Sequence, residues 1–210
     1  MMMKINSKVG PLLAPLPTVM VTCGDMQDGI STPDGGSNII TIAWTGIINS
    51  NPPMTYVSVQ RTRNSYEIIR QRGEFVINVT TEELVKAMDY CGVKSGRDVD
   101  KFAELGLHKE AADEVACPLI AESPVNIECK VVDVKEMPTH VMFMAEIVAV
   151  HIDDTYVDEN GEYRYGDMKL VSFNHGKYYR VNSEELGFFG YSIMKPKTAK
   201  KRAQVKPRRV

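Results

Sequence analysis

The amino-acid sequence predicts a mainly β protein, an antiparallel barrel formed by one domain. Short apolar or alternating runs bounded by Gly, Pro, Asn or Asp recur along the chain, which is the pattern of strands separated by turns. These runs do not alternate regularly with helical segments, as a parallel sheet would require. Because an open sheet exposes unpaired edges, this many antiparallel strands favour closure into a barrel. The 210 residues, 43% of them hydrophobic, suffice for one buried core.

The strands are predicted in chain order from these runs. Four short strands are expected in the first part of the chain, at residues 19–23, 39–44, 55–60 and 75–79. Residues 45–50 are small or polar, and we interpret them as a turn. Two long strands around a turn at 135–138 then form an antiparallel hairpin. Residues 176–181 supply a further strand, after a turn at 157–163.

Three short helices are predicted from their capping residues. Asn64 with Glu67 has the spacing of a capping box ahead of a helix at 65–72, and Thr80 with Glu83 repeats it ahead of a helix at 81–91. A third helix is expected to begin near Asp98. These helices are inserted between strands and leave the domain mainly β.

Composition and residue spacing argue against several other classes of protein. No stretch approaches the roughly 18 apolar residues of a membrane helix, and prolines interrupt the N-terminal apolar patch. We therefore expect a cytoplasmic protein with no membrane association. The four cysteines lack CxxC spacing, and His108, His151 and His175 lie at no spacing typical of a metal site. Reduced thiols and no bound metal are expected.

The charge of the chain is divided between an acidic body and a basic tail. From Lys195 onward there are eight Lys or Arg and no acid, which leaves the preceding residues at a formal charge of about −10. We assign residues 1–192 to the domain and 193–210 to a flexible tail. A solvated end is the simplest interpretation, and docking onto an acidic subunit or contact with nucleic acid are the alternatives. The body has no basic, aromatic-rich face, so nucleic acid is the weaker alternative.

Two polar clusters follow strand or helix ends and precede helix starts, where free amide groups favour an anion. The first cluster comprises Arg61, Thr62, Arg63, Asn64 and Ser65. The second comprises Lys94, Ser95, Gly96, Arg97 and Lys101. Together they could hold one phosphate monoester, and the alternative is that both are ordinary solvated loops. Neither cluster has the GxGxxG or Walker A pattern of the common nucleotide-binding folds.

Five blocks of sequence carry a family resemblance, at residues 38–60, 63–79, 91–102, 140–150 and 176–181. In this order they resemble the flavin reductase-like, FMN-binding split-barrel family, and most of all its flavoredoxin-type members. The similarity extends over roughly residues 10–192. It implies an antiparallel, Greek-key-like split β-barrel with a few short helices.

The resemblance also implies which residues bind FMN. The set is Trp44, Thr45, Gly46, Asn49, Ser50, Ser58, Val59, Gln60, Arg63, Asn64, Ser65, Ser95 and Lys101. In similar proteins the residues around Thr45 and Asn49 line the ring and ribityl chain, and those matching Arg63 and Ser65 meet the phosphate. For Trp44 we favour packing in the core, with stacking on the flavin as the alternative.

The implied function is that of an FMN-dependent oxidoreductase. Electrons would pass from NAD(P)H or a redox protein through FMN to an acceptor, and the alternative is a non-enzymatic flavin-binding electron carrier. FMN carries the redox chemistry, so no catalytic side chain is required. Many similar reductases have Gly-Asp-His before the long strand, whereas this chain has Pro138, Thr139 and His140. His140 is therefore expected either at a nicotinamide site or as a plain strand residue. A homodimer is implied as well.

Overall fold

The computed structural model describes residues 3–181 and 184–195. The predicted basic tail at 193–210 therefore lies almost entirely outside the described residues, and the boundary between domain and tail stays a prediction. Within the described ranges, no helix has the length and apolar character needed to cross a membrane.

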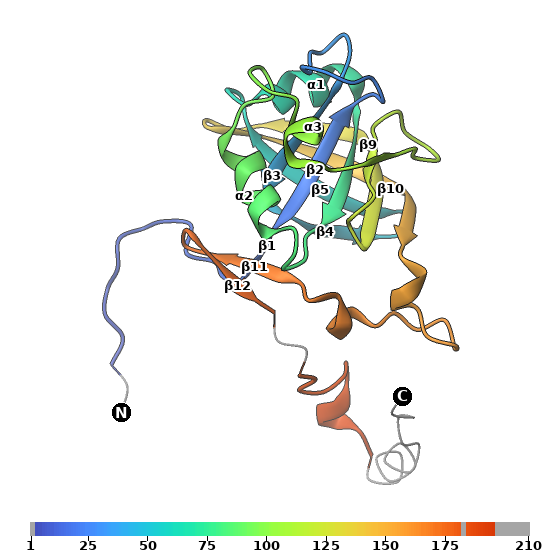
Figure 1. Cartoon of the computed structure of the whole chain (residues 1–210). Helices are drawn as coiled ribbons and strands as arrows, with labels where there is room; N and C mark the ends of the chain where they lie inside the picture. Colours follow the sequence, from blue (N-terminus) through green and yellow to red (C-terminus); the bar gives the residue numbers. More distant parts are fainter. Residues whose placement is uncertain (1–2, 182–183, 196–210) are drawn as a thin grey trace.

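The largest element is a seven-stranded antiparallel sheet that curls into a barrel (Figure 1). Its spatial order is β3-β2-β6-β9-β10-β5-β4. The strands are β2 Val19–Gly24, β3 Ser37–Ile42, β4 Thr45–Ser50, β5 Pro53–Gln60, β6 Glu74–Val79, β9 Val125–Glu136 and β10 His140–Ile152. The predicted mainly β fold, including the long β9–β10 hairpin, is confirmed.

Smaller elements surround the barrel. One additional sheet joins β1 Leu16–Pro17, β11 Val171–Asn174 and β12 Lys177–Arg180, and another joins β7 Lys109–Glu110 and β8 Leu119–Ile120. The helices are α1 Asn64–Arg72, α2 Val85–Val93 and α3 Lys101–Leu105. Single 3-10 turns occur at Asp154–Tyr156, Tyr165–Met168 and Tyr191–Ile193. Helices α2 and α3 both contact β3, which brings the second polar cluster beside that strand.

The described residues form three core clusters, and the two larger ones share strand β2. Alternate residues of a strand point to opposite faces, so Val21 lies in the barrel interior with Phe75 and Phe143. Met20 points the other way and packs with Met88 and neighbouring side chains beneath the helices. Both faces of β2 are therefore covered, which explains why its residues are all buried.

The barrel is split between β3 and β5. These strands are not paired in the sheet, where β3 and β4 occupy the two ends of the spatial order. The chain leaves β3, passes through Trp44 and returns as β4 along β5, and the Ser58 amide donates to the Trp44 carbonyl at 3.0 Å. This hydrogen bond closes the split at Trp44, and the remaining part between β3 and β5 stays open. We call this opening the seam.

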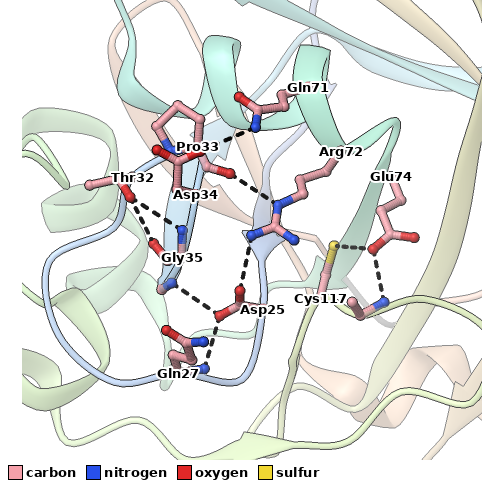
Figure 2. A network of polar contacts seen from close by, with 12 residues as sticks. Asp25, Gln27, Thr32, Pro33, Asp34, Gly35, Gln71, Arg72, Glu74 and Cys117 are labelled. Atoms are coloured by element: carbon pink, nitrogen blue, oxygen red, sulfur yellow. Dashed lines mark hydrogen bonds and ion pairs between the residues drawn. The ribbon is translucent and has the colours of Figure 1, made fainter.

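The loop between β2 and β3 is anchored to α1, as Figure 2 shows. The Arg72 guanidinium donates to the Pro33 carbonyl at 3.1 Å and to the Asp25 carboxylate at 3.0 Å. The other oxygen of Asp25 accepts the amides of Gln27 and Gly36, each at 3.0 Å. This network fixes the path of the loop, which carries Ser31 toward the start of α1.

Three local predictions were wrong. Residues 45–50 form the exposed edge strand β4 and not a turn. Asn64 does not cap α1, because its side chain donates to Ser31 of the anchored loop. Helix α2 begins at Val85 with Leu84 as N-cap, so Thr80 caps nothing, and the Asp100 carboxylate caps α3. In the first two cases a contact more distant in sequence, with β5 or with Ser31, replaced the local interaction.

Candidate functional site

A pocket opens along the seam between β3 and β5. It is lined by Ile40, Thr41, Ile42, Ala43, Trp44, Ser58, Val59, Gln60, Arg63 and His140. Because β3 ends the sheet on this side, its outer edge offers backbone donors and acceptors to a ligand. We call this the seam pocket.

Trp44 and His140 form the aromatic wall of the seam pocket. Their ring centroids are 4.4 Å apart, and Trp44 is 39% exposed. The expectation of core packing for Trp44 was therefore wrong, since the chain leaves β3 at this point and turns the indole outward. Burial lowers the pKa of His140 below its usual value, so the imidazole is neutral at neutral pH. Its Nδ1 lies 2.9 Å from the Thr139 hydroxyl.

A second pocket adjoins the first and brings the two polar clusters together. It is lined by Asn38, Ile40, Thr62, Arg63, Asn64, Ser65, Cys91, Lys94, Ser95, Gly96, Arg97 and Lys101. Ile40 and Arg63 also line the seam pocket, so the two pockets are adjacent. The N-terminus of α1 faces this space, and within the described chain its N-cap residue Arg63 supplies no side-chain cap. We call it the anion pocket.

Two arginines hold the clusters against one another. Arg63, from the first cluster, donates to the carbonyl of Gly92 at 3.2 Å, next to the second cluster. Arg97, from the second cluster, donates to the carbonyl of Thr62 at 3.0 Å. Among the described residues no carboxylate lines either pocket. The lining cations therefore make this region positive on an otherwise acidic body.

Lys101 is buried in the wall of the anion pocket. Only 3% of the residue is exposed, and its ammonium donates to the carbonyls of Ile39 at 2.6 Å and Cys91 at 2.9 Å. Burial lowers its pKa. Lys101 thus joins β3 to α2 behind the pocket, and two of its three N–H groups are already used.

The residues present fit FMN. The pockets together offer an aromatic cleft that leads to a cationic pocket at a helix N-terminus, which matches a ring system joined to a phosphate. The side-chain amide oxygen of Asn38, Oδ1, in a residue only 3% exposed, has no hydrogen-bond partner within the described structure. Gly96 packs so tightly that a Cβ there would lie 2.2 Å from this oxygen. The pocket therefore holds an unsatisfied polar atom and a cradle that only glycine permits.

The structure brings together most of the predicted cofactor residues but not all. Those that line one of the two pockets are Trp44, Ser58, Val59, Gln60, Arg63, Asn64, Ser65, Ser95 and Lys101. The remaining four, Thr45, Gly46, Asn49 and Ser50, lie on edge strand β4 and line neither pocket. The Thr45 hydroxyl donates to the Tyr56 carbonyl at 2.6 Å, and the Asn49 amide to the Pro52 carbonyl at 2.8 Å.

Several pocket residues, Lys94 and Asn38 among them, were not in the predicted set. Lys94 and Asn38 both line the anion pocket. Lys94 was part of the second cluster, and its charge was the signal that should have included it. Asn38 precedes an apolar strand and had no comparable signal, because only the fold places it beside α1.

A third polar group lies away from both pockets. Asp113, Glu128 and His151 each offer a possible ligand atom, and these atoms lie within 4.8 Å of one another. Glu128, with a side chain 0% exposed, accepts the amides of Asp113, Glu114 and Val115 and lies 2.5 Å from His151 Nε2. Both of its oxygens are thus already bonded. The arrangement anchors the 111–117 loop to β9 and β10.

Glu128→Gln is expected to destabilise the fold by about 1–3 kcal/mol, because the new amide group would face backbone donors. Burial alone raises the pKa of Glu128, but hydrogen bonds from the Asp113 amide and His151 outweigh it and hold the pKa below its usual value. In the wild type, the ionised Glu128 carboxylate therefore contributes fully to the free energy of unfolding at pH values above the ordinary glutamate pKa. This contribution is lost as the pH falls through the lowered pKa of Glu128 in the folded protein. Urea denaturation at several pH values would measure both effects.

The control is Glu114→Gln, which removes a neighbouring charge. The Glu114 carboxylate forms an exposed ion pair with Lys130, in which Oε2 and Nζ are 3.6 Å apart. It should change stability by less than about 0.5 kcal/mol. Equal losses in the two variants would mean that Glu128 does not anchor the loop.

The fold and the two pockets define a class of protein, the split barrels, here with the seam between β3 and β5. Within that class, the chain belongs to the flavin reductase-like family, because the sequence profile of the flavin reductase like domain matches residues 13–179. The mainly β fold and the predicted family are thereby confirmed.

Individual proteins agree with this assignment. The structure resembles flavoredoxin of Desulfovibrio vulgaris (Miyazaki F), with a TM-score of 0.81 and 31% identity over 90% of this chain and 100% of that chain. It also resembles flavoredoxin from Methanosarcina acetivorans, with a TM-score of 0.75 and 29% identity over 92% of this chain and 100% of that one. A protein of Archaeoglobus fulgidus is 31% identical over 82% of this chain and 92% of its own length.

Proposed function

We propose that this protein is an FMN-dependent oxidoreductase that passes electrons from NAD(P)H or a redox protein to an acceptor. The observation that carries the proposal is that the seam pocket and the anion pocket lie next to one another and share the lining residues Ile40 and Arg63. A flavin ring and a phosphate joined by a flexible chain need these two environments side by side. The similarity to two flavoredoxins supports a flavin in this place.

Each group of pocket residues then has a defined task. The N-terminus of α1, Ser65 and the cations of the anion pocket hold the phosphate. Ser58, Val59 and Gln60 follow the cofactor along β5, and Trp44 with His140 borders the open side of the ring. FMN supplies the redox chemistry when it is bound. The protein positions the ring and limits the access of water, and no side chain has to act as a general acid or base.

A non-enzymatic electron carrier is the second candidate. The stretch Pro138, Thr139 and His140 keeps only the histidine of the Gly-Asp-His triplet associated with nicotinamide binding in similar reductases, and this favours a protein donor. The neutral His140 beside Trp44 would in that case border the surface through which electrons leave the flavin.

A homodimer in the cytoplasm is part of the proposal. On edge strand β4, Ile47 is 71% exposed, and its neighbour Ile48 is also exposed. An apolar sheet edge of this kind is suited to burial against a second copy. The predicted cofactor residues on β4, such as Asn49 and Ser50, would then be available to the pocket of the partner subunit.

Absorption spectroscopy tests the proposal and separates its two forms. After the purified protein is mixed with FMN and freed of excess ligand, its absorption spectrum is expected to show flavin bands. The fluorescence of the bound flavin is expected to be quenched. Under anaerobic conditions NADH and then NADPH are added, followed by dithionite. Bleaching by a nicotinamide supports the reductase, and bleaching by dithionite alone supports the carrier. A protein that retains no flavin contradicts both forms.

A further inference from the structure

Four cations line the anion pocket, and they differ in how they are already bonded. They are Arg63, Lys94, Arg97 and Lys101. A guanidinium or ammonium that already donates to a backbone carbonyl has a fixed position and fewer free N–H groups. The bonding of each cation therefore shows which of them can meet a ligand and which of them shape the pocket.

Three of the four cations are bound to the protein itself. Arg63 donates to the Gly92 carbonyl and Arg97 to the Thr62 carbonyl, and these two hydrogen bonds hold the two clusters together. Lys101 donates to two buried carbonyls behind the pocket. The charges of these three side chains contribute to the positive potential of the pocket, but their hydrogen bonds to backbone carbonyls hold them in the pocket wall.

Lys94 is the exception. Its side chain is exposed and, within the described parts of the chain, makes no hydrogen bond or ion pair. Its backbone is fixed, because the Lys94 amide donates to the Tyr90 carbonyl at 2.9 Å at the end of α2. A cation on a rigid base with all three N–H groups free is suited to bind an anion directly.

The pocket is built for a ligand on grounds other than charge. The side-chain Oδ1 of Asn38 is buried there without a partner in the described structure, although Nδ2 of the same side chain donates to the Ser65 hydroxyl at 2.8 Å. Such an atom favours a ligand that also brings a hydroxyl group. A sugar-alcohol phosphate has both a hydroxyl group and an anion.

We propose that Lys94 is the residue that selects phosphorylated over unphosphorylated flavin, by pairing directly with the phosphate in the anion pocket. This inference rests on the proposed function. Arg63, Arg97 and Lys101 are positioning residues that hold the clusters around the ligand, and Lys94 closes the open side of the pocket over the phosphate.

The test compares FMN and riboflavin binding in Lys94→Met, Lys94→Arg and a matched control. Lys86→Met removes the same charge from the same helix, at an exposed position that lines neither pocket. Dissociation constants come from the quenching of flavin fluorescence. Lys94→Met is expected to weaken FMN about tenfold to a hundredfold, the usual range for a lost charge-assisted hydrogen bond. Riboflavin should change by less than twofold in the same variant.

Two further variants and the salt dependence of binding test the role of Lys94. Lys94→Arg should recover most of the FMN affinity, and Lys86→Met should match the wild type for both ligands. The salt dependence of FMN binding should be weaker in Lys94→Met than in the wild type. An unchanged ratio of FMN to riboflavin affinity in Lys94→Met overturns the role of Lys94 while the proposed function stands. Wild-type protein that binds neither flavin overturns both.

Discussion

Lys101→Met is expected to lower the free energy of unfolding by about 2–4 kcal/mol, since it leaves two buried carbonyl groups without a donor. These carbonyls belong to Ile39 on β3 and Cys91 on α2, so the loss also loosens the contact between the strand and the helix. Lys101 was predicted from the family resemblance as a cofactor residue. The structure indicates that it acts mainly by holding the pocket wall in place.

Thermal and urea denaturation, with and without FMN, would measure the effect. A ligand that binds only the folded state stabilises it by an amount that grows with the logarithm of its concentration divided by Kd. FMN should therefore restore part of the loss in Lys101→Met if the pocket still forms. Lys86→Met, at an exposed position on α2, should leave stability within about 0.5 kcal/mol of the wild type. Unchanged stability together with lost FMN binding in Lys101→Met would show that Lys101 serves the ligand and not the fold.

Gly96→Ala is expected to weaken FMN binding by about tenfold or more and to destabilise the protein by about 1–3 kcal/mol. A Cβ at this position would lie 2.2 Å from Asn38 Oδ1 and 2.8 Å from Ser31 Oγ. Asn38 is almost fully buried and hydrogen-bonded to Ser65, so it cannot withdraw without breaking that bond. The added methyl group therefore distorts the anion pocket from inside.

Two further variants separate this clash from a general loss of flexibility. Gly10→Ala adds the same methyl group where no atom lies within 4 Å, and it should bind FMN as the wild type does. In Gly96→Ala with Asn38→Ala the obstructing side chain is gone, so stability should exceed that expected from adding the two single effects. Strict additivity in the double variant would rule out the clash as the cause. Calorimetry and FMN titration give both quantities.

Much of the site could be predicted because its residues form short continuous clusters. Arg63 to Ser65 and Lys94 to Arg97 are local sequence features, and each precedes a helix start. The resemblance to a flavin-binding family added the seam residues on β5. These predictions depended on short segments whose residue types indicate their chemistry without reference to the rest of the chain.

The errors occurred where distant segments decide the outcome. Residues 45–50 lack the apolar alternation of a half-buried strand because β4 is an exposed edge, and its pairing with β5 is what makes it a strand. The capping box at Asn64 failed because Ser31, far along the chain, accepts a hydrogen bond from the side chain that was expected to cap α1. Trp44 was expected in the core because a lone strand tryptophan usually packs there, whereas the split of the barrel exposes it.

By itself, the sequence determined the mainly β class, the position of most strands and the two polar clusters rich in Lys and Arg. Alternation of side chains along a strand and the composition of turns are local properties, and a single sequence contains them. The tertiary structure alone decided that the two clusters share one pocket, that this pocket adjoins the seam pocket, and that Lys101 is buried while the Lys94 side chain is unbonded among the described residues. Those features depend on which carbonyl groups and side chains meet across the barrel, and residues distant in sequence supply them.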